Sequence, residues 1–409
     1  MAYRAPSASV IMAPNRSTSL LVLTRIEPVD LLRGLVIVLM VLDHVRDYFH
    51  ASAHAFDPLD PAQTTPLLYA TRWVTHLCAP GFVFLAGVSA WLQWDRHRDR
   101  ARLSRFLLTR GLWLVLLELT VVSFGWAFTF GMVFMQVIWA IGWAMVALAA
   151  LIWLPRQAVL AIGIAIIAGH NLLDPIEPEQ LGALSGLWTI MHEGGVFVHD
   201  GVPFALAAYP FLPWIGVMAF GYGLGTIFTG PPDRRDRTLI VLGAAMIALF
   251  VLLRLVNLYG DPEPWKVEGD AVRTVMAFLD VAKYPPSLMF ICATLGPALL
   301  LMPLLARLRG PAARFLLAFG SVPLFAYVLH IYILHALAIV AAVATGHDPA
   351  YLIDFVGNFF LQPQLLEGTG YPLAIVYVVW LLVLALLYPL CRYWSDLKRR
   401  RRDWWLSYL

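Results

Sequence analysis

The sequence has little charge and few cysteines for its length. Only 13% of the 409 residues are charged, 60% are hydrophobic, and the mean hydropathy is +0.73. A chain this poor in charge cannot cover a water-soluble surface, which excludes a soluble globular protein. The three cysteines all lie in apolar runs, so neither a disulfide framework nor a zinc site of the usual spacing is available. We therefore expect no metal cofactor.

The apolar residues gather in runs that are long enough to cross a bilayer, and about ten such runs can be counted. The first 28 residues hold only the short run 20–23, too brief for a signal-peptide core, so we expect the first span to insert uncleaved. We predict an all-α polytopic membrane protein. The ten predicted spans are 29–49, 73–93, 106–126, 133–154, 157–173, 209–229, 238–258, 286–306, 315–345 and 372–394. Because 315–345 is too long for one straight crossing, Pro323 is expected to divide it into a short interfacial helix and the true span.

Most of the 29 basic residues fall in connections that would lie on one side of these spans. The positive-inside rule then places both termini in the cytoplasm. The overall charge of +3 reflects this asymmetry between faces, and nothing in it indicates nucleic-acid binding. We expect three parts: a cytoplasmic segment 1–28, a transmembrane domain 29–395 and a basic cytoplasmic tail 396–409. The basic connections on the cytoplasmic side are 4–25, 96–110, 156, 234–237, 307–314 and 392–402.

The first predicted span carries ionisable residues along one helical stripe. Asp30, Arg33, Ile37, Met40, His44 and Asp47 follow one another at alternating spacings of three and four residues, so they share a face. Ionisable groups inside a span are costly and usually functional. We predict that Arg33 lies near one membrane surface and His44 near the other.

His44 is the predicted general base. Asp43 precedes it and Asp47 follows one turn later, so either carboxylate would orient the imidazole and raise its basicity. The alternative is a buried structural histidine that holds helices together. His50 follows in the outer loop, where a surface role is equally plausible.

Arg72 and His76 share a face at the start of the second span, at the membrane level of His44. We expect them on the acceptor side of a site, although Arg72 would otherwise pair with loop carboxylates and His76 would fill packing space. Lys283 precedes two prolines at the entry to the eighth span and either covers the mouth of the site or reaches to the interface.

Three residues deeper in the predicted spans are supporting candidates. Glu118 needs a partner, which we expect to be a histidine or an indole, unless it supports the base. His330 shares a face with Tyr327 and is the better candidate for a tunnel wall. His335 is about 140° away from His330 around the helix, so the two cannot readily face one ligand.

The first two spans resemble the bacterial relatives of heparan-alpha-glucosaminide N-acetyltransferase, within the transmembrane acyltransferase superfamily that also includes the acyltransferase-3 family. The likeness covers nearly the whole chain. In the lysosomal enzyme the position matching His44 looks like an asparagine, and the histidine lies nearest to His50, so these two histidines are alternatives for the proton transfer. The motifs that carry the resemblance are 30–44, 72–87, 257–262, 283–287 and 319–335.

This resemblance implies about ten helices around a tunnel, with acyl-CoA entering from the cytoplasm and a sugar from outside. Residues 29–395 would then form a transmembrane acyltransferase domain in a bacterial inner membrane, in contact with lipids and compatible with a homodimer. Arg33 and Arg110 suit the CoA phosphates, and the neighbouring Asp30 is counted with them in the acyl-CoA site. Trp126, Trp188 and Trp214 are candidates to stack on a pyranose, although tryptophan at an interface is ordinarily an anchor.

The leading hypothesis is transfer of an acyl group, expected to be acetyl, from cytosolic acyl-CoA to an amine or hydroxyl of an extracytoplasmic carbohydrate. The enzyme would modify the cell envelope by N- or O-acetylation, with acyl-CoA as cosubstrate. The rival is a proton-coupled secondary transporter or lipid flippase, in which Glu118, His330 and His335 would form a proton relay. No inverted halves or matched broken helices are evident in support of this rival.

Overall fold

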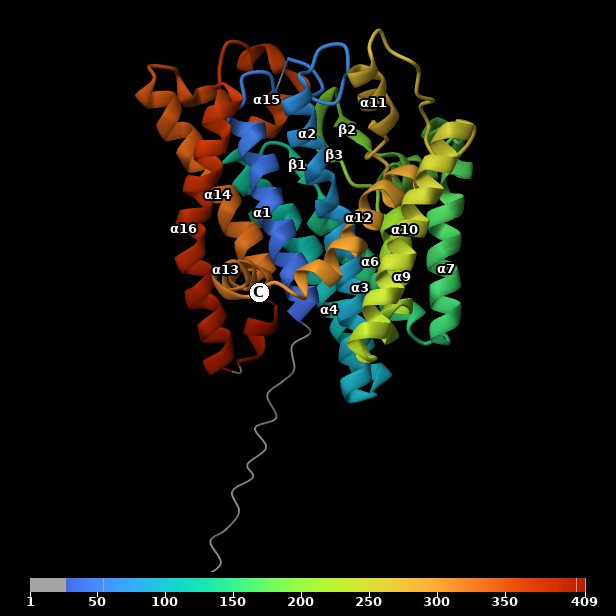
Figure 1. The fold of residues 1–409 in the computed structure, drawn as a ribbon. Coiled ribbons are helices and arrows are strands. Elements are labelled where there is room, and N and C mark those ends of the chain that lie inside the picture. The colour runs from blue at the N-terminus through green and yellow to red at the C-terminus, as the bar shows by residue number, and fades with distance from the viewer. Residues whose placement is uncertain (1–26, 54, 402, 409) are drawn as a thin grey trace, which may run out of the picture.

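The structure, a computed structural model, describes residues 27–53, 55–401 and 403–408 (Figure 1). Most of the predicted cytoplasmic segment 1–28 therefore lies outside the described residues. The described chain forms a bundle of long helices, with short helices and strands gathered toward one end. A helical membrane protein is confirmed.

The long helices account for every predicted span. They are α1 (Glu27–Phe49), α3 (Cys78–His97), α4 (Arg100–Leu117), α6 (Val137–Leu151), α7 (Arg156–Gly169), α9 (Leu212–Gly223), α10 (Pro232–Val256), α12 (Leu288–Leu305), α13 (Gly310–Gly320), α14 (Pro323–Ala344) and α16 (Leu373–Arg400). The shorter helices are α2 (Pro66–Val74), α5 (Ser123–Ala127), α8 (Ser185–Trp188), α11 (Ala271–Leu279) and α15 (Phe355–Leu361). Single-turn 3-10 or π segments include η1 (Thr75–Leu77), η2 (Glu118–Val122), η3 (His170–Leu173), η4 (Pro178–Leu184), η5 (Thr189–Glu193), η6 (Gly225–Thr229), η7 (Pro349–Leu352), η8 (Pro363–Leu366) and η9 (Trp404–Ser407).

Eight helical segments of the described chain are long and apolar enough to cross a membrane. The helix α6 is apolar but shorter, and α1 spans 23 residues but carries more charge than the other candidates. The eight segments are Pro66–His97, Arg100–Ala127, Arg156–Leu173, Leu212–Thr229, Pro232–Val256, Leu288–Leu305, Pro323–Ala344 and Leu373–Arg400. The count of ten stays a prediction that depends on α1 and α6.

The charged helix α1 lies inside the bundle, where it contacts α3, α12, α13, α14 and α16. Most of its residues are buried. A helix with ionisable groups needs protein rather than lipid around it, which accounts for this central place. Gly34 of α1 and Gly320 of α13 permit a close crossing, because a Cβ on either glycine would collide with the backbone of the other helix.

The long apolar run 315–345 is divided as the sequence predicts. α13 ends at Gly320, and α14 begins at Pro323, which occupies the first helical position where a missing N–H costs nothing. The division turns the second part into a separate helix of 22 residues. His330 therefore lies one third of the way along α14 rather than near the middle of a longer helix.

A small sheet stands near the end of the bundle that also holds α2, α11 and α15 (Figure 1). Its order is β1 (Val133–Met135), β3 (Val202–Ala207), β2 (Gly195–His199), with β1 parallel and β2 antiparallel to β3. Val133 pairs with Ala205. The prediction of an all-α chain missed this sheet, because three strands of three to six residues leave little periodicity against an apolar background.

Candidate functional site

Two cavities open between the helices of the described chain. The larger, here called the His44 cavity, has a volume of about 560 Å³. It lies at the C-terminal end of α1, and its wall includes both ionisable and aromatic side chains. Its charged lining residues are Asp43, Arg46, Asp47, Asp57, Arg72, Glu193 and Lys283, and its aromatic ones include Trp126, Tyr209 and Tyr284.

The smaller cavity, here called the Arg33 cavity, has a volume of about 310 Å³. Its charged lining residues are Arg33, Arg110 and Lys398, so every charge on its wall is positive. Apolar side chains from α3, α4, α6 and α14 form most of the remainder. The cavity therefore combines a cationic part with a narrow apolar passage.

The two cavities adjoin at the start of α6. Gln136 lines the His44 cavity, and the next residue, Val137, lines the Arg33 cavity. Trp126 lines the His44 cavity and Tyr327 lines the Arg33 cavity, and we call the side chains between the two cavities the partition. The Trp126 indole N–H and the Tyr327 hydroxyl are buried and form no hydrogen bond of ordinary geometry within the described part of the chain.

Four charged side chains form a compact network on the wall of the His44 cavity. One guanidinium nitrogen of Arg72 lies 2.7 Å from both carboxylate oxygens of Asp43. Arg46 donates to Asp43 at 3.2 Å and to Asp47 at 2.6 Å. Two buried positive charges thus compensate two negative ones, which offsets the cost of removing them from water.

The ring of His44 is oriented by a second histidine. Nδ1 of His44 lies 2.7 Å from Nε2 of His330, and Nδ1 of His330 lies 3.2 Å from the carbonyl oxygen of Ala326. A carbonyl can only accept, so a neutral His330 carries its proton on Nδ1 and accepts from His44 at Nε2. His44 then keeps an unprotonated Nε2, which is the form that a general base requires.

This arrangement corrects the predicted partner of His44. The expected carboxylates, Asp43 and Asp47, bond to Arg46 and Arg72, and within the described residues no hydrogen bond joins either to His44. Guanidinium groups compete successfully for carboxylates because charge-assisted pairs are stronger than bonds to a neutral imidazole. His330, predicted only as a tunnel wall with Tyr327, is the residue that contacts the base.

His50 and His76 line neither cavity. Nδ1 of His50 lies 2.8 Å from the Ser52 hydroxyl, and burial together with Arg46 lowers the pKa of this histidine. His76 is 1% exposed and packs against Phe290, with neither ring nitrogen hydrogen-bonded in the described chain. The expected acceptor-side position of His76 is therefore wrong, because its ring turns toward α12.

Arg33 lies where the sequence predicts, on the face of α1 that carries His44 but in the other cavity. It donates to Asp30 at 2.7 Å and to the hydroxyl of Ser89 at 2.9 Å. Arg110 lines the same cavity from α4. Asp30 does not line the cavity itself and instead orients Arg33.

Glu118 has a partner that the sequence did not suggest. One carboxylate oxygen accepts the backbone N–H of Trp139 at 3.0 Å, in the first turn of α6. Free amides at a helix start favour a carboxylate, so Glu118 caps α6 from a neighbouring helix. The partner of Glu118 is thus the backbone N–H of Trp139 and not the expected histidine or indole side chain. This bond stabilises the start of α6, where the two cavities adjoin.

Lys283 lines the His44 cavity, and its Nζ lies 5.0 Å from the ring centre of Tyr284. Of the three tryptophans proposed to stack on a sugar, only Trp126 lines a cavity. Trp188 bonds to a backbone carbonyl, and Trp214 is fully buried. Sequence reasoning missed Tyr209 and Tyr284, for which the only available signal was the adjacency of Tyr284 to Lys283.

Comparisons with known proteins identify the family of the chain. No curated protein matches the chain. A family model described as heparan-alpha-glucosaminide N-acetyltransferase, catalytic, matches residues 25–254, more than half of the 409 residues. The matched part includes α1, with both Arg33 and His44, and the helix α10 up to Arg254. The chain belongs to the heparan-alpha-glucosaminide N-acetyltransferase catalytic family, and it is a membrane acetyltransferase.

Proposed function

We propose that this protein transfers an acetyl group from acetyl-CoA to an amine or hydroxyl of an extracytoplasmic carbohydrate. The observation that carries the proposal is the His44 and His330 pair, which supplies an unprotonated imidazole nitrogen beside a cavity. The family match supports acetyl transfer as the reaction.

The orientation in the membrane is part of this proposal. With α1 and α6 counted as crossings the chain has ten spans, and the start of α1 and the end of α16 lie at the same end of the bundle (Figure 1). The basic connections favour the cytoplasm for that end. The Arg33 cavity then faces the cytoplasm, and the His44 cavity faces outward in a bacterial inner membrane.

Acetyl-CoA would bind through the Arg33 cavity. Arg33, Arg110 and Lys398 present the positive charge that attracts phosphate groups. The apolar remainder of the wall suits a thin pantetheine arm. Its thioester would reach the partition at Trp126 and Tyr327, one layer of side chains from His44.

Transfer then needs one base and one leaving group. Nε2 of His44 takes the proton of the acceptor as its nitrogen or oxygen attacks the thioester carbonyl carbon. The new C–N or C–O bond forms, the C–S bond breaks, and the proton taken up by His44 passes to the departing CoA thiolate, which leaves as the thiol and restores the neutral imidazole. His330 accepts the hydrogen bond of Nδ1 throughout, which keeps the ring in place.

The network of Asp43, Arg46, Asp47 and Arg72 forms the acceptor side of this site, together with Lys283. Hydrogen-bonding groups of both signs suit a sugar, which offers donors and acceptors on each face. In this proposal the two carboxylates hold the arginines in position and do not take the proton.

The transporter alternative receives less support from the geometry. Glu118 caps α6, and both ring nitrogens of His335 face backbone carbonyl oxygens, those of Gly125 and Leu352. Only His330 of the proposed relay contacts another titratable side chain that lines a cavity.

The test replaces one histidine at a time and measures transfer of radiolabelled acetyl from acetyl-CoA to amino sugars in membrane vesicles. His44→Ala should lower turnover by about 10²- to 10⁴-fold, since general-base catalysis contributes that much. His50→Ala is the matched control and should leave turnover within about twofold to threefold of wild type, because it removes no general base. Near wild-type turnover of His44→Ala, or a loss confined to His50→Ala, would contradict the assignment.

A further inference from the structure

The loop of residues 282–287, which carries Lys283 and Tyr284 to the His44 cavity, is tied at both ends to one carboxylate. Oδ2 of Asp261 accepts the backbone N–H of Ala282 at 2.9 Å and the hydroxyl of Ser287 at 2.7 Å. The backbone N–H of Ser287 also donates to the carbonyl of Ala282 at 2.9 Å. The loop is therefore closed on itself, and one carboxylate oxygen holds both of its ends.

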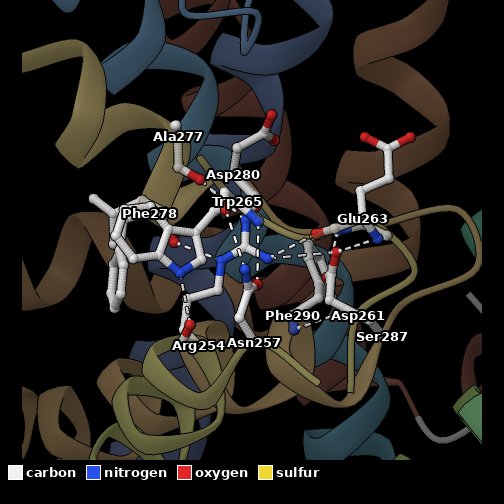
Figure 2. A network of polar contacts seen from close by, with 12 residues as sticks. Arg254, Asn257, Asp261, Glu263, Trp265, Ala277, Phe278, Asp280, Ser287 and Phe290 are labelled. Atoms are coloured by element: carbon white, nitrogen blue, oxygen red, sulfur yellow. Dashed lines mark hydrogen bonds and ion pairs between the residues drawn. The ribbon is translucent and has the colours of Figure 1, made fainter. Parts of the chain in front are cut away.

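Arg254 holds the segment that leads into this loop (Figure 2). This residue lies in the last turn of α10 and is 2% exposed. Its guanidinium donates to the carbonyl oxygens of Glu263, Ala277 and Phe278, each at 3.0 Å, and to that of Asp280. It also lies 3.7 Å from Oδ1 of Asp261. One planar side chain thus joins both ends of the stretch between residues 261 and 280.

Further contacts fix the chain around this cluster. Asn257 and Trp265 exchange two hydrogen bonds, of 3.1 and 3.2 Å, and the Trp265 indole donates to the carbonyl of Arg254 at 2.6 Å. On the other side, Nε2 of His170 lies 2.9 Å from the carbonyl oxygen of Pro286. Figure 2 shows Asn257 and Trp265 beside the Arg254 side chain, whose guanidinium the carbonyl groups of the preceding paragraph surround.

Arg254 and Asp261 touch neither cavity, so they have no direct contact with a substrate there. Burying a charged pair is no efficient way to gain stability, because apolar side chains of the same size would often serve as well or better. The N–H donors of the Arg254 guanidinium and the two oxygens of the Asp261 carboxylate have fixed directions, however. They therefore define the geometry of a loop in a way that apolar packing cannot. The part of the chain whose geometry they define is the wall formed by Lys283 and Tyr284.

We infer that Arg254 and Asp261 are positioning residues that fix Lys283 and Tyr284 as the acceptor-binding wall of the His44 cavity. They set how well the acceptor binds and leave acetyl-CoA binding unchanged. This inference rests on the proposed function for its kinetic part. It also assigns a role to the motif 257–262, which the catalytic proposal does not use, through its contacts with the motif 283–287.

The kinetic experiment uses Asp261→Asn with acetyl-CoA as donor and glucosamine as acceptor probe. This change keeps the side-chain size, but it removes the negative charge beside Arg254 and leaves one oxygen where Glu263 N–H, Ala282 N–H and the Ser287 hydroxyl now share two. We expect kcat/KM for glucosamine to fall by roughly 10- to 100-fold, since small misplacements of positioning groups have effects of this size. KM for acetyl-CoA should change less than about twofold, since its cavity is not altered. Asp270→Asn is the matched control: Asp270 caps α11 in the same region, and asparagine caps equally well.

A double-mutant cycle separates positioning from general stability. If Asp261 acts through Lys283, then Asp261→Asn should cost little more in a Lys283→Met background, whereas independent effects would multiply. Arg254→Lys should behave like Asp261→Asn, since lysine cannot reach four carbonyls at once. Multiplying effects, or equal changes in both KM values, would overturn the inference.

A labelling experiment needs no enzymatic activity and therefore remains informative if the proposed function fails. Lys283 is 9% exposed and Lys266 is exposed on the same segment, so an amine-reactive ester should label Lys266 first. Asp261→Asn should raise labelling of Lys283 relative to Lys266 several-fold, and Asp270→Asn should not. Unchanged labelling of Lys283 would overturn the inference, whereas absence of acetyl transfer in the wild type would overturn only the proposed function.

Discussion

The His44 cavity and the Arg33 cavity differ in how their charges are arranged. Charged side chains of both signs line the former, and Asp43, Arg46, Asp47 and Arg72 are joined in one network. The charged side chains that line the latter are all positive. A network with equal numbers of positive and negative charges fixes the positions of its side chains but produces little net electrostatic field. Charges of one sign produce a field that attracts a ligand of the opposite sign. In the proposed function, the His44 cavity therefore holds the reacting groups in position, and the Arg33 cavity binds the anionic donor.

The two cavities are also connected differently to the rest of the chain. The His44 cavity takes residues from α1, from short elements such as η5, β3 and α15, and from the loops that hold Asp57 and Lys283, whereas long helices supply nearly all of the Arg33 cavity. Loops vary more readily than helices. In the proposed function, acceptor recognition would therefore use the more variable part of the molecule, and donor recognition the more regular part.

The largest effect that would test this comparison is expected at His330. His330→Ala removes the acceptor for Nδ1 of His44 and should lower kcat by roughly 10- to 100-fold without altering either KM, because the base loses its orientation. His330→Gln retains a carbonyl oxygen that can accept the same hydrogen bond and should recover part of the loss. Steady-state kinetics in detergent would measure both. Equal activity of His330→Ala and wild type would show that His44 needs no partner.

A smaller and more selective effect is expected at Arg33. Arg33→Gln should raise KM for acetyl-CoA by about tenfold, since a charge-assisted hydrogen bond contributes roughly 1.5–3 kcal/mol. KM for the acceptor should not change, because Arg33 does not line the His44 cavity. Arg102→Gln is an exposed control on α4. A rise in the acceptor KM alone would reverse the assignment of the two cavities.

The loops around the His44 cavity should also make stability depend on pH. Burial, with a contribution from Asp57, raises the pKa of Asp280 from 3.8 to about 7. The folded protein therefore holds this proton more tightly than the unfolded chain, so the stabilisation is complete below pH 4 and is lost as the pH rises to 7. Asp280→Asn cannot ionise and should flatten the decrease in melting temperature between pH 5 and pH 8. An unchanged slope would show that Asp280 ionises freely in the folded protein.

The smallest effect is expected at Glu118, in the partition between the cavities. Glu118→Gln keeps an oxygen that can accept the Trp139 N–H, so transfer should remain within about threefold of wild type. A proton relay would instead require a titratable group at this position. Acetyl transfer by reconstituted protein would distinguish these cases, and loss of activity in Glu118→Gln would favour a relay.

Several features were predictable because they depend on residues close together in the chain. The separation of Arg33 and His44 along one face follows from helical geometry, and the structure places them in different cavities. The division before Pro323 follows from the missing N–H of proline. The partner of His44 did not follow, since His330 is 286 residues away and competes with carboxylates on the same helix.

The cluster at Arg254 shows the same limit. Its residues are spread from 254 to 287, in a region whose prolines suggested ordered turns, yet no local pattern indicates that one carboxylate anchors both ends of a loop. The three-stranded sheet is similar, because β1 pairs with a strand about seventy residues later.

The sequence by itself determined that this protein is a helical membrane protein with ionisable groups on its first helix, because hydrophobicity and helical period are properties of neighbouring residues. Only the tertiary structure decided which of those groups meet. Arg72 bonds to Asp43, His330 bonds to His44, and the two cavities adjoin at the start of α6. Such choices depend on competition among side chains that are brought together only when distant helices pack.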